Sequence, residues 1–430
     1  MSEYPGTGFR DLCGLGARTA GAALRGPRSF DAGRVLHDWL KQLTIRYGSP
    51  NVRLNIPRMP LLLVTDRELS RRILGDPPRR AGFSPGTPKR KGMSFLAPEA
   101  LTVAEDEAWT RLRPFNEQVL CAGGPHQHQR AFLGRGRRAF AGPPSSVSDL
   151  RERMGRAMLD IVFGEGVAPG RLASEARDLF GLVQNPLKRR LGGARARRRV
   201  AGLYQSLRDQ WERSDGTPAD SLLGMARTGL DGESDGTLLQ QVPHWMFTFN
   251  GSGADLLTRG LALIGSRPDV LDRVRRELAD AGPLDDPGAV GRLAYLESCL
   301  LEGARLFPPV RFTFHRCGGH AVAGETRIPA GTEILQVFSL GQRDREFDST
   351  ADDFRPERWS EPGSRAEAAY PNLFLSGARR CPGRDLILFV CKGAAASLLH
   401  SGLEVRSERL ARDPAPFTFP EKHLAFVRRS

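Results

Sequence analysis

The most constraining feature of this chain is a ten-residue loop that ends in Cys-Pro-Gly and leads directly into an apolar helix. Residues 374–383 read Phe-Leu-Ser-Gly-Ala-Arg-Arg-Cys-Pro-Gly, and the pattern of residues 385–399 predicts a helix. Proline is favoured in the first turn of a helix, so Cys381 stands at the helix N-terminus. There the unpaired backbone N–H groups and the helix dipole stabilise a thiolate. The loop therefore predicts a single sulfur held rigidly in its anionic form.

The other residues of the loop suit a metal-bound thiolate. Gly377 and Gly383 permit tight turns and a close approach of the backbone. Arg379 places a cation two residues from the sulfur, where it can bind a carboxylate. These are the properties required of the cysteine ligand of a haem iron. A single cysteine is more often a buried structural residue, so the prediction depends on the spacing of the whole loop.

The loop resembles the cysteine-ligand loop of the cytochrome P450 family, and two further segments are similar to that family. Glu302 and Arg305, in Glu-Gly-Ala-Arg, lie about one helical turn apart and match the family's ExxR motif, as does the Leu-Phe-Pro-Pro that follows. Residues 354–359, Phe-Arg-Pro-Glu-Arg-Trp, resemble its PERF-type segment. The resemblance implies that Arg358 joins Glu302 and Arg305 in a buried structural network, since buried charges are tolerated only when paired.

A third match concerns the groups that would hold the haem propionates. Residues 109–113, Trp-Thr-Arg-Leu-Arg, match the family's WxxxR helix, and Trp109 and Arg113 share a helix face from which both can donate hydrogen bonds. The resemblance implies one further propionate partner, either His315 or Arg316. The expected cofactor is heme b, with Cys381 as its metal ligand. The residues expected to bind it are Trp109, Arg113, His315, Arg316, Phe374, Gly377, Arg379, Cys381 and Gly383.

The long apolar segment 238–264 departs from the family's pattern. Members usually carry a small-Gly-x-acid-Thr run there, whose acid and hydroxyl relay protons to bound dioxygen. In this chain Gly251 stands where the acid is expected, and Ser252 replaces the threonine but keeps a hydroxyl. Asn250 forms hydrogen bonds but is not a general acid near neutral pH. The expected catalytic residues are Asn250, Gly251 and Ser252, and the route of proton delivery stays open.

Asp255, one turn beyond Gly251, has two interpretations. It could deliver protons through a water molecule. Alternatively, it pairs with Arg259, four residues further along the same helix. We favour the local pair.

Aromatic side chains define the expected substrate pocket. The resemblance places the pocket walls on the helix over the iron and at residues 312–314 and 417–419. The aromatic residues favour an apolar ligand, and the glycines at 251 and 253 leave room above the iron. A terpenoid or another hydrophobic secondary metabolite fits this description, as does a fatty or aromatic substrate. The expected lining aromatics are Phe247, Phe312, Phe314, Phe417 and Phe419.

Helical patterns dominate the chain, and short strand patterns flank them. The helix-rich body is expected at about 105–307 and 382–400, and a small β region at about 50–65, 310–340 and 414–428. Neither an internal repeat nor a Gly/Ser-rich linker divides the chain, so we expect one domain over residues 1–430. The predicted class is mainly α with a small β-sheet region (α+β). The resemblance implies the P450 fold, with a single triangular haem-binding domain.

The chain carries a formal net charge of +14, and only six of its 63 basic residues are lysines. This balance raises nucleic acid, anionic membrane and an acidic protein as possible partners. The basic run at 188–199 lacks interleaved aromatics and a nucleic-acid motif, so a solvated helix face is favoured and no nucleic-acid partner is expected. A better use for the charge is docking of an acidic ferredoxin near Cys381. The residues expected to form that docking face are Arg379, Arg380, Arg384 and Lys392.

The six cysteines are scattered, and none forms a CxxC pair. This pattern disfavours a zinc ribbon or a small disulfide scaffold and indicates a reducing cytoplasm. The first residues contain no long apolar run, so we expect neither a signal peptide nor a membrane anchor. A composition heavy in Arg and rich in Ala, Gly and Pro suggests a bacterial coding sequence of high GC content. We expect a cytoplasmic monomer.

Three functions remain open after the motifs are considered together. The first is a haem-thiolate monooxygenase that uses O2, with electrons from a ferredoxin and its ferredoxin reductase, and acts on a small hydrophobic substrate. The second is an enzyme of the same fold with atypical chemistry, either peroxide-driven, cyclising or coupling, because the usual acid is absent. The third is a non-catalytic haem- or ligand-binding protein. Turnover with a reductase system separates the third from the other two.

Overall fold

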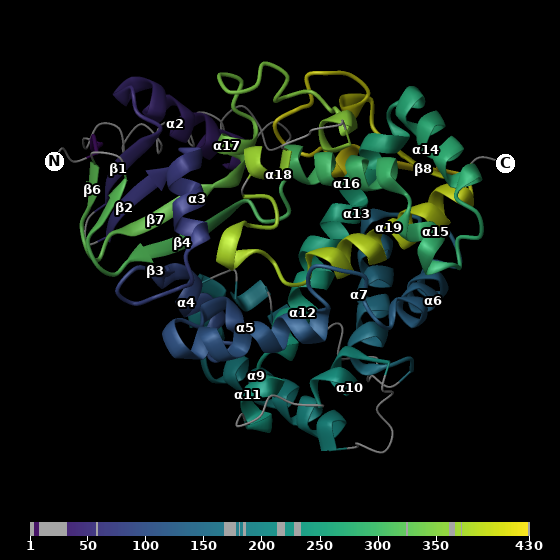
Figure 1. Ribbon diagram of the computed structural model, residues 1–430, viewed down its shortest axis with the longest axis horizontal. Coiled ribbons are helices and arrows are strands. Elements are labelled where there is room, and N and C mark those ends of the chain that lie inside the picture. The colour runs from purple at the N-terminus through teal and green to yellow at the C-terminus, as the bar shows by residue number, and fades with distance from the viewer. Residues whose placement is uncertain are drawn as a thin grey trace.

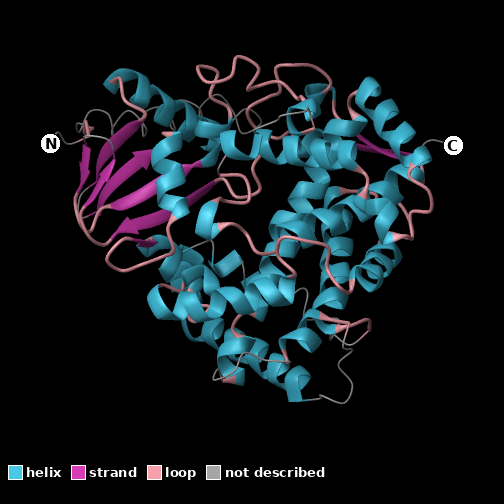
Figure 2. Ribbon diagram, in the orientation of Figure 1, coloured by secondary structure: helices cyan, strands magenta, loops and turns pink. Residues whose placement is uncertain are grey.

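Helices fill most of the molecule, and a β-sheet occupies one corner (Figures 1 and 2). The computed structural model describes residues 4–7, 32–56, 59–166, 178–179, 181–183, 186–212, 220–227, 234–323, 326–360, 366–370 and 372–428. The outline in Figure 1 is roughly triangular, with the sheet near the N-terminus at one corner and helices near the C-terminus at another. The predicted class, mainly α with small β regions, is confirmed.

The main sheet has five strands in the order β1-β2-β7-β4-β3. The strands β1 and β2 form the predicted antiparallel hairpin, β2 pairs with β7 in parallel, and the remaining pairs are antiparallel. Segments far apart in the sequence therefore meet in one sheet, and β4 is brought beside β3 and β7. The bounds are β1 Asn51–Ile56, β2 Met59–Val64, β3 Phe83–Pro85, β4 Phe312–Cys317 and β7 Glu333–Val337.

A helix covers each face of this sheet. On one face, Trp39, Leu40 and Leu43 of α2 (Ala32–Tyr47) pack against the side chains of β1 and β2. On the other, Leu69 and Ile73 of α3 (Arg67–Gly75) pack against β2, β4 and β7. Strand β2 is buried on both sides, which explains its continuous apolar run. Helix α3 begins after Asp66, whose carboxylate accepts a hydrogen bond from the Leu69 N–H at 2.6 Å.

Two smaller pairs of strands lie outside the main sheet. Strands β5 (Ala321–Ala323) and β6 (Thr326–Ile328) form one, and β8 (Leu403–Arg406) and β9 (Ala425–Arg428) form the other. The predicted β region at 414–428 is therefore only partly right, since residues 414–420 form a loop between the paired strands. Three prolines in that loop lack the N–H that a strand ladder requires.

The helical body is built around one central apolar axis. It begins with α12 (Val242–Thr248), passes through a single π-helical turn at Phe249–Gly253 and continues as α13 (Ala254–Gly265). Helix α13 is buried on nearly every side, as expected of a helix that is apolar all round. The π-helical turn falls on the Gly-rich run that stood out in the sequence, and such turns are frequent at functional sites.

The other helices surround this axis, and their bounds follow. They are α4 Thr87–Met93, α5 Asp106–Leu120, α6 Gln129–Ala139, α7 Val147–Phe163, α9 Pro186–Glu212, α10 Leu222–Ala226, α11 Asp235–Leu239, α14 Pro268–Asp280, α15 Pro287–Gly291, α16 Ala294–Leu306, α17 Phe338–Gln342, α18 Ala366–Ala369 and α19 Arg384–His400. Helices α16 and α19 both pack against α13, so the ExxR segment and the helix after Cys381 share one core.

Candidate functional site

The cysteine loop is a tight turn packed against α3. The Cys381 N–H donates to the Phe374 carbonyl at 2.8 Å, which closes the loop just before α19 begins. Gly377 has a φ of 59°, and a Cβ there would lie 2.5 Å from the Cα of Gly75, so only glycine fits. Phe374 and Leu375 also have positive φ angles, of 54° and 61°. Non-glycine residues hold that conformation at a cost of about 1–3 kcal/mol each and cluster at functional sites.

Cys381 differs electrostatically from the other buried cysteine of the same helix. Burial raises the pKa of the Cys381 thiol, while the Gly383 N–H and the Arg113 charge act in the opposite direction. For Cys391, burial alone raises the pKa. Both cysteines are free thiols. The sulfur of Cys381 thus has partial support for its anionic form, and a bound metal ion would complete the stabilisation of the thiolate.

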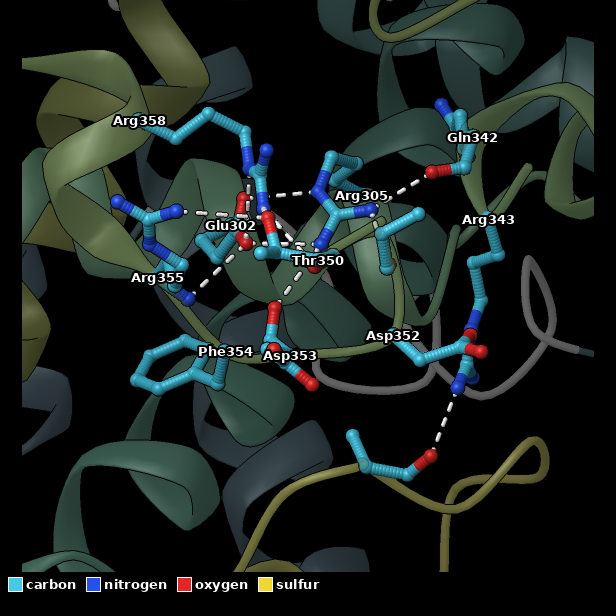
Figure 3. Close-up of polar contacts among 12 residues, drawn as sticks. Glu302, Arg305, Gln342, Arg343, Thr350, Asp352, Asp353, Phe354, Arg355 and Arg358 are labelled. Carbon is cyan, nitrogen blue, oxygen red and sulfur yellow. Dashed lines mark hydrogen bonds and ion pairs between the residues drawn. The ribbon is translucent and has the colours of Figure 1, made fainter. Parts of the chain in front are cut away.

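A buried ion network lies behind the loop (Figure 3). Glu302 and Arg305 are fully buried and form two parallel contacts, Nε to Oε2 and Nη2 to Oε1, both of 2.8 Å. The remaining N–H groups of Arg305 donate to backbone carbonyls of Gln342 and Ala351 at 2.6 and 2.7 Å. The Arg358 Nε lies 3.3 Å from the Glu302 Oε1. The three residues named from the resemblance therefore meet in one network.

Further residues in this network were not predicted from the sequence. The Trp359 indole N–H donates to the Glu302 Oε2 at 2.8 Å, and Arg358 also pairs with Asp348. Burial acts to raise the pKa of Asp348, but hydrogen bonds from Thr350 and the Arg358 charge outweigh it and lower the pKa to about 2. The Tyr370 hydroxyl donates to the same carboxylate at 3.0 Å. Every charge in the network thus has a partner, as buried charges require.

A cavity of about 250 Å³ joins this network to the cysteine loop. Trp359 and Tyr370 line it from the network side, and the backbone of Phe374 to Gly377 lines it from the loop side. The network and the loop are therefore adjacent parts of one structure rather than separate features.

On the other side of the loop, the Trp-x-x-x-Arg helix contacts the cysteine segment directly. The Arg113 guanidinium lies 5.9 Å from the Trp109 ring centre on α5, and its Nη1 donates to the Arg380 carbonyl at 2.7 Å. Its Nε pairs with Glu117 at 2.7 Å. Trp109 and Arg113 thus lie on one helix face, and Arg113 reaches the segment next to Cys381.

The choice between His315 and Arg316 is decided by the alternation of strand β4. His315 is buried and points toward the cysteine loop, where its Nδ1 lies 3.1 Å from the Arg379 Nη1. Arg316 is exposed. Successive side chains of a strand point to opposite faces, so Arg316 cannot share the position of His315. The expectation for Arg316 is therefore wrong.

A cluster of buried cations surrounds His315. Arg379 donates its Nε to the Asp76 carbonyl at 3.0 Å, and burial lowers the pKa of Arg379 to about 10. Burial and the Arg379 charge lower the pKa of Lys89 to about 8. The Nε2 of His315 is buried without a hydrogen-bond partner among the described residues. In that part of the chain, neither Lys89 nor Arg379 forms an ion pair with a carboxylate, and the Asp76 charge acts on Arg379 alone, so positive charge exceeds negative charge in the cluster.

Lys89 was not predicted from the sequence, although two signals pointed to it. It is one of only six lysines in a chain that otherwise uses arginine. It also follows strand β3, whose last residue, Pro85, is paired with His315. Burial, with a contribution from the Lys89 charge, lowers the pKa of His244 on α12 to about 4, so Lys89 acts on groups from two elements.

The π-helical turn carries the predicted serine hydroxyl. The Ser252 Oγ donates to the Thr248 carbonyl at 2.6 Å, which leaves its lone pairs free to accept a hydrogen bond. Gly251 is exposed, and a Cβ there would meet nothing within 4 Å. Gly253 is different, because a Cβ there would lie 2.6 Å from the Ile387 Cδ1 of α19. Asn250 belongs to the same turn, and its side chain lies outside the described residues.

Asp255 is committed to arginine side chains. Its Oδ2 lies 2.7 Å from the Arg259 Nη2, and its Oδ1 lies 2.9 Å from the Arg151 Nη2 of α7. The predicted Arg259 pair is therefore confirmed. Both oxygens of the Asp255 carboxylate are therefore engaged by guanidinium groups.

The predicted pocket aromatics lie in three parts of the chain: strand β4, the loop before β9 and helix α12. Phe312 and Phe314 on β4 meet edge to face, with ring centres 5.7 Å apart, and Phe312 is half exposed. Phe419 meets Phe307 edge to face at 5.3 Å, beyond the end of α16. The Arg343 guanidinium lies 5.0 Å from the Phe417 ring centre. Phe247 is partly buried on α12.

Comparisons with known proteins bear on the whole arrangement. A family model of cytochrome P450 matches residues 206–400, which contain the π-helical turn, Glu302, Arg305, Arg358 and Cys381. A cyanobacterial protein solved with retinoic acid bound, CYP120A1, superposes with a TM-score of 0.75, covering 91% of this chain and 94% of that one at 18% identity. Over residues 206–400 the chain is therefore similar to the cytochrome P450 family. At that identity the structural likeness shows the fold alone.

Curated proteins similar to this chain come from several kingdoms. The P450 monooxygenase pkfB of Emericella nidulans is 30% identical over 217 residues, covering 44% of this chain and 42% of its own length. The alkane hydroxylase MAH1 of Arabidopsis thaliana is 29% identical, over 34% of this chain and 30% of its own. The mitochondrial 1,25-dihydroxyvitamin D(3) 24-hydroxylase of Mus musculus is 36% identical, over 29% and 24%. The matched region is less than half the length of each relative.

The residues around Cys381 fit the haem cofactor of the P450 family. Cys381 would provide one sulfur for the iron, and no cluster of three or more His, Cys, Asp or Glu side chains in the described part of the chain offers another metal site. Haem carries two propionates, and the unbalanced cluster of Lys89 and Arg379 matches two negative charges. The unpartnered Nε2 of His315 offers one more hydrogen bond.

The basic docking face expected near Cys381 is wrong in part. Arg379 turns inward to His315 and is buried. Lys392 is also buried, and its ammonium pairs with Glu297 at 2.7 Å and donates to the Gly291 carbonyl at 3.0 Å. Arg384 pairs with Asp385, which leaves Arg380 as the fully exposed member of the four. Neighbours in the sequence here point in different directions around a turn and a helix.

Proposed function

We propose that this protein is a haem-thiolate monooxygenase that inserts one oxygen atom of O2 into a small hydrophobic substrate. The observation that carries the proposal is the partly buried free thiol of Cys381, held at the start of α19 in a loop braced by the buried Glu302–Arg305 pair. Haem bound through such a thiolate supplies the electron density that favours cleavage of the O–O bond.

The residues around the loop divide into binding and bracing roles. Cys381 binds the iron, and the donors Trp109, Arg113, Arg379 and His315 hold the propionates, with Lys89 as a further cation. Glu302, Arg305 and Arg358 keep the loop in place without touching the cofactor. Arg305 and Arg358 pair with carboxylates, whereas Lys89 and Arg379 form no ion pair among the described residues.

On the oxygen side, Ser252 is the hydroxyl in a position to hand on a proton. Its O–H is held by the Thr248 carbonyl, so it accepts a hydrogen bond from a water molecule or a substrate hydroxyl. Gly251 offers no acid, and the paired Asp255 is a poor substitute. This departure supports a second candidate, a P450 with atypical chemistry that is peroxide-driven, cyclising or coupling.

We propose apolar substrates for the pocket, such as a terpenoid or another hydrophobic secondary metabolite. The pairs Phe312–Phe314 and Phe307–Phe419 support this class. The names of the alkane and vitamin D hydroxylases among the relatives also indicate apolar substrates for those proteins. For electrons we propose a ferredoxin with its reductase, and for location the cytoplasm of a bacterium. Among the described residues, none of the helices is both long and apolar enough to cross a bilayer.

Turnover in isotopically labelled O2 tests the function. With ferredoxin, ferredoxin reductase and NADPH, a monooxygenase places one labelled oxygen atom in the product and the other in water. Product formed only with added peroxide, or a product without labelled oxygen, would support the atypical candidate instead. The haem-loaded protein could also bind apolar ligands and form no product from any of them under either condition. That result would support a non-catalytic haem- or ligand-binding protein.

A further inference from the structure

The C-terminal loop between β8 and β9 is fastened to the body by arginines from three separate elements. Near its start, Arg267 donates to the Leu410 carbonyl at 3.0 Å and forms a bidentate pair with Asp413 at 2.7 and 2.8 Å. In the middle, Arg343 donates to the carbonyls of Ala415 and Pro416 at 2.7 and 2.8 Å. Both guanidinium groups are buried, so these two anchors are firm.

The far end of the loop is fastened differently. Arg151 of α7 grips the Glu421 carboxylate with two contacts of 2.7 and 2.8 Å. The side chains of Arg151 and Glu421 are 34% and 42% exposed, against 3% for Arg343 and 9% for Arg267. An exposed ion pair contributes about 0–1 kcal/mol, and its bidentate geometry places this one toward the stronger end. The loop therefore has two buried anchors and one that solvent can reach.

Phe417 and Phe419 lie in the sequence between the buried anchors and the exposed one. Phe419 rests against Phe307 at 5.3 Å between ring centres, and the Arg259 guanidinium lies 5.7 Å from its ring centre. The Arg343 guanidinium, which pairs with Asp352 (Figure 3), lies 5.0 Å from the Phe417 ring centre. Phe417 is therefore in contact with one of the buried anchors. The position of Phe419 thus depends on the solvent-accessible end of the loop.

The same arginine also connects this loop to the central helix. The Arg151 Nη2 lies 2.9 Å from the Asp255 Oδ1, and Asp255 is three residues beyond Ser252. Asp255 in turn pairs with Arg259, whose Nη1 donates to the Phe307 carbonyl at 2.7 Å. One chain of contacts therefore links α7, the helix that carries Ser252, and both aromatic rings of the Phe307–Phe419 pair.

We propose that Arg151 and Glu421 form a latch that holds Phe419 against the central helix and thereby limits the size of substrate that the site admits. The inference rests on the proposed function, in which Phe417 and Phe419 belong to the pocket wall. Arg151 and Glu421 are positioning residues, since they act through Phe419 rather than on the substrate. Opening the latch frees the segment from Phe417 to Glu421, while the buried anchors keep the rest of the loop in place.

Two variants and a matched control test the latch. Glu421→Gln and Arg151→Gln each remove one partner, and Arg151→Lys keeps the charge but loses the bidentate fork. Arg138→Gln is the control, because it breaks a solvent-exposed pair with Glu165 that lies outside the loop. The probes are N-alkylimidazoles of increasing chain length, whose nitrogen binds the ferric iron and shifts its absorption spectrum whatever the natural substrate is.

We expect the wild type to bind long alkyl chains more weakly than short ones. In Glu421→Gln and Arg151→Gln the affinity for long chains relative to short ones should rise by about threefold to tenfold, equivalent to roughly 0.7–1.4 kcal/mol. Arg151→Lys should be intermediate and Arg138→Gln unchanged. High salt should raise the relative affinity of the wild type for long chains toward that of the variants, because solvent reaches the Arg151–Glu421 pair. Amide hydrogen exchange at residues 417–421 should quicken in both Gln variants.

The outcomes separate the latch from the proposed function. A wild type that shows no thiolate-ligated haem would overturn the proposed function, and the substrate-limiting role with it. An intact haem spectrum with the same chain-length profile in wild type and both Gln variants would overturn the latch alone. Faster exchange without a changed profile would also overturn it, since the pair would then be merely structural.

Discussion

The thiolate side and the oxygen side of the proposed haem site differ in how closely their residues are packed and paired. On the thiolate side, Cys381 is closed in by the Phe374 carbonyl, Gly377 admits no other residue, and Glu302 and Arg305 satisfy each other in full burial. On the oxygen side, Gly251 faces open space and a lone serine replaces the usual acid and threonine. The contrast indicates that iron ligation tolerates little change, whereas the chemistry performed above the iron is free to vary.

The largest effect should come from breaking the thiolate-side network. Glu302→Gln leaves the buried Arg305 guanidinium without its counter-charge, and removing one partner of a buried pair costs about 3–5 kcal/mol. We expect loss of haem and a large fall in the free energy of unfolding, measured by denaturant titration. Glu357→Gln, two residues before Trp359, breaks the exposed pair with Arg273 and should cost less than about 1 kcal/mol. Equal effects of the two would contradict the account.

The next effect tests the cation cluster at the edge of the site. Burial lowers the pKa of Lys89 from 10.5 to about 8, so the folded haem-free protein loses this proton before the unfolded chain does. The free energy of unfolding of haem-free protein should therefore rise between about pH 8 and pH 10.5, by up to about 3 kcal/mol. Below pH 8 that gain is absent.

Two comparisons isolate Lys89 in this measurement. Lys89→Met should lack the rise, so the difference between wild type and variant carries the signal. Haem should abolish it as well, because propionates that pair with Lys89 keep it protonated. If the free energy of unfolding depended on pH in the same way in haem-free wild type and Lys89→Met, the charged form of Lys89 would not destabilise the folded protein.

A smaller effect concerns the serine of the oxygen side. Ser252→Ala removes the only hydroxyl at the threonine position, and we expect several times more of the consumed NADPH to appear as hydrogen peroxide than in the wild type. Ser252→Thr should behave like the wild type, because it keeps the hydroxyl. The measurement is the ratio of product to NADPH in the reconstituted system. An unchanged ratio in Ser252→Ala would remove Ser252 from proton delivery.

The smallest effect adds what the oxygen side lacks. Since a Cβ at Gly251 meets nothing within 4 Å, Gly251→Asp should fold and place a carboxyl where the family usually has one. We expect the ratio of product to NADPH to rise by about twofold, a barrier change of less than 1 kcal/mol. Gly251→Asn is the matched control, with the same size but no acid. A rise in both variants would point to filled space rather than proton delivery.

Much of the thiolate side was predictable because its signals are local in sequence. Glu302 and Arg305 are one helical turn apart, and the loop before Cys381 is recognised from the spacing of consecutive residues. Neither signal requires knowledge of the tertiary structure. Lys89 was missed because its role depends on a strand pairing that brings β3 beside His315. Trp359 was noticed within the PERF-like segment, but its bond to Glu302 depends on how that segment docks on α16.

The errors have a common physical origin in the direction of side chains. Arg316 was kept beside His315 because the sequence leaves the phase of a strand undetermined, and alternation then places the two on opposite faces. Arg379 and Lys392 were read as a docking face from their nearness to Cys381, but both turn inward. The predicted strands at 414–420 failed because arginine side chains, rather than a neighbouring strand, satisfy the carbonyls of that loop.

The most direct test of the central claim is the reduced carbon monoxide difference spectrum of three proteins. Wild type and Cys391→Ala should both show the absorption band of thiolate-ligated haem, because Cys391 is a buried thiol within α19 whose Sγ contacts the Gly253 carbonyl. Cys381→Ala should lack that band. Absence of the band in the wild type, or its persistence in Cys381→Ala, would contradict the assignment of Cys381 as the haem ligand.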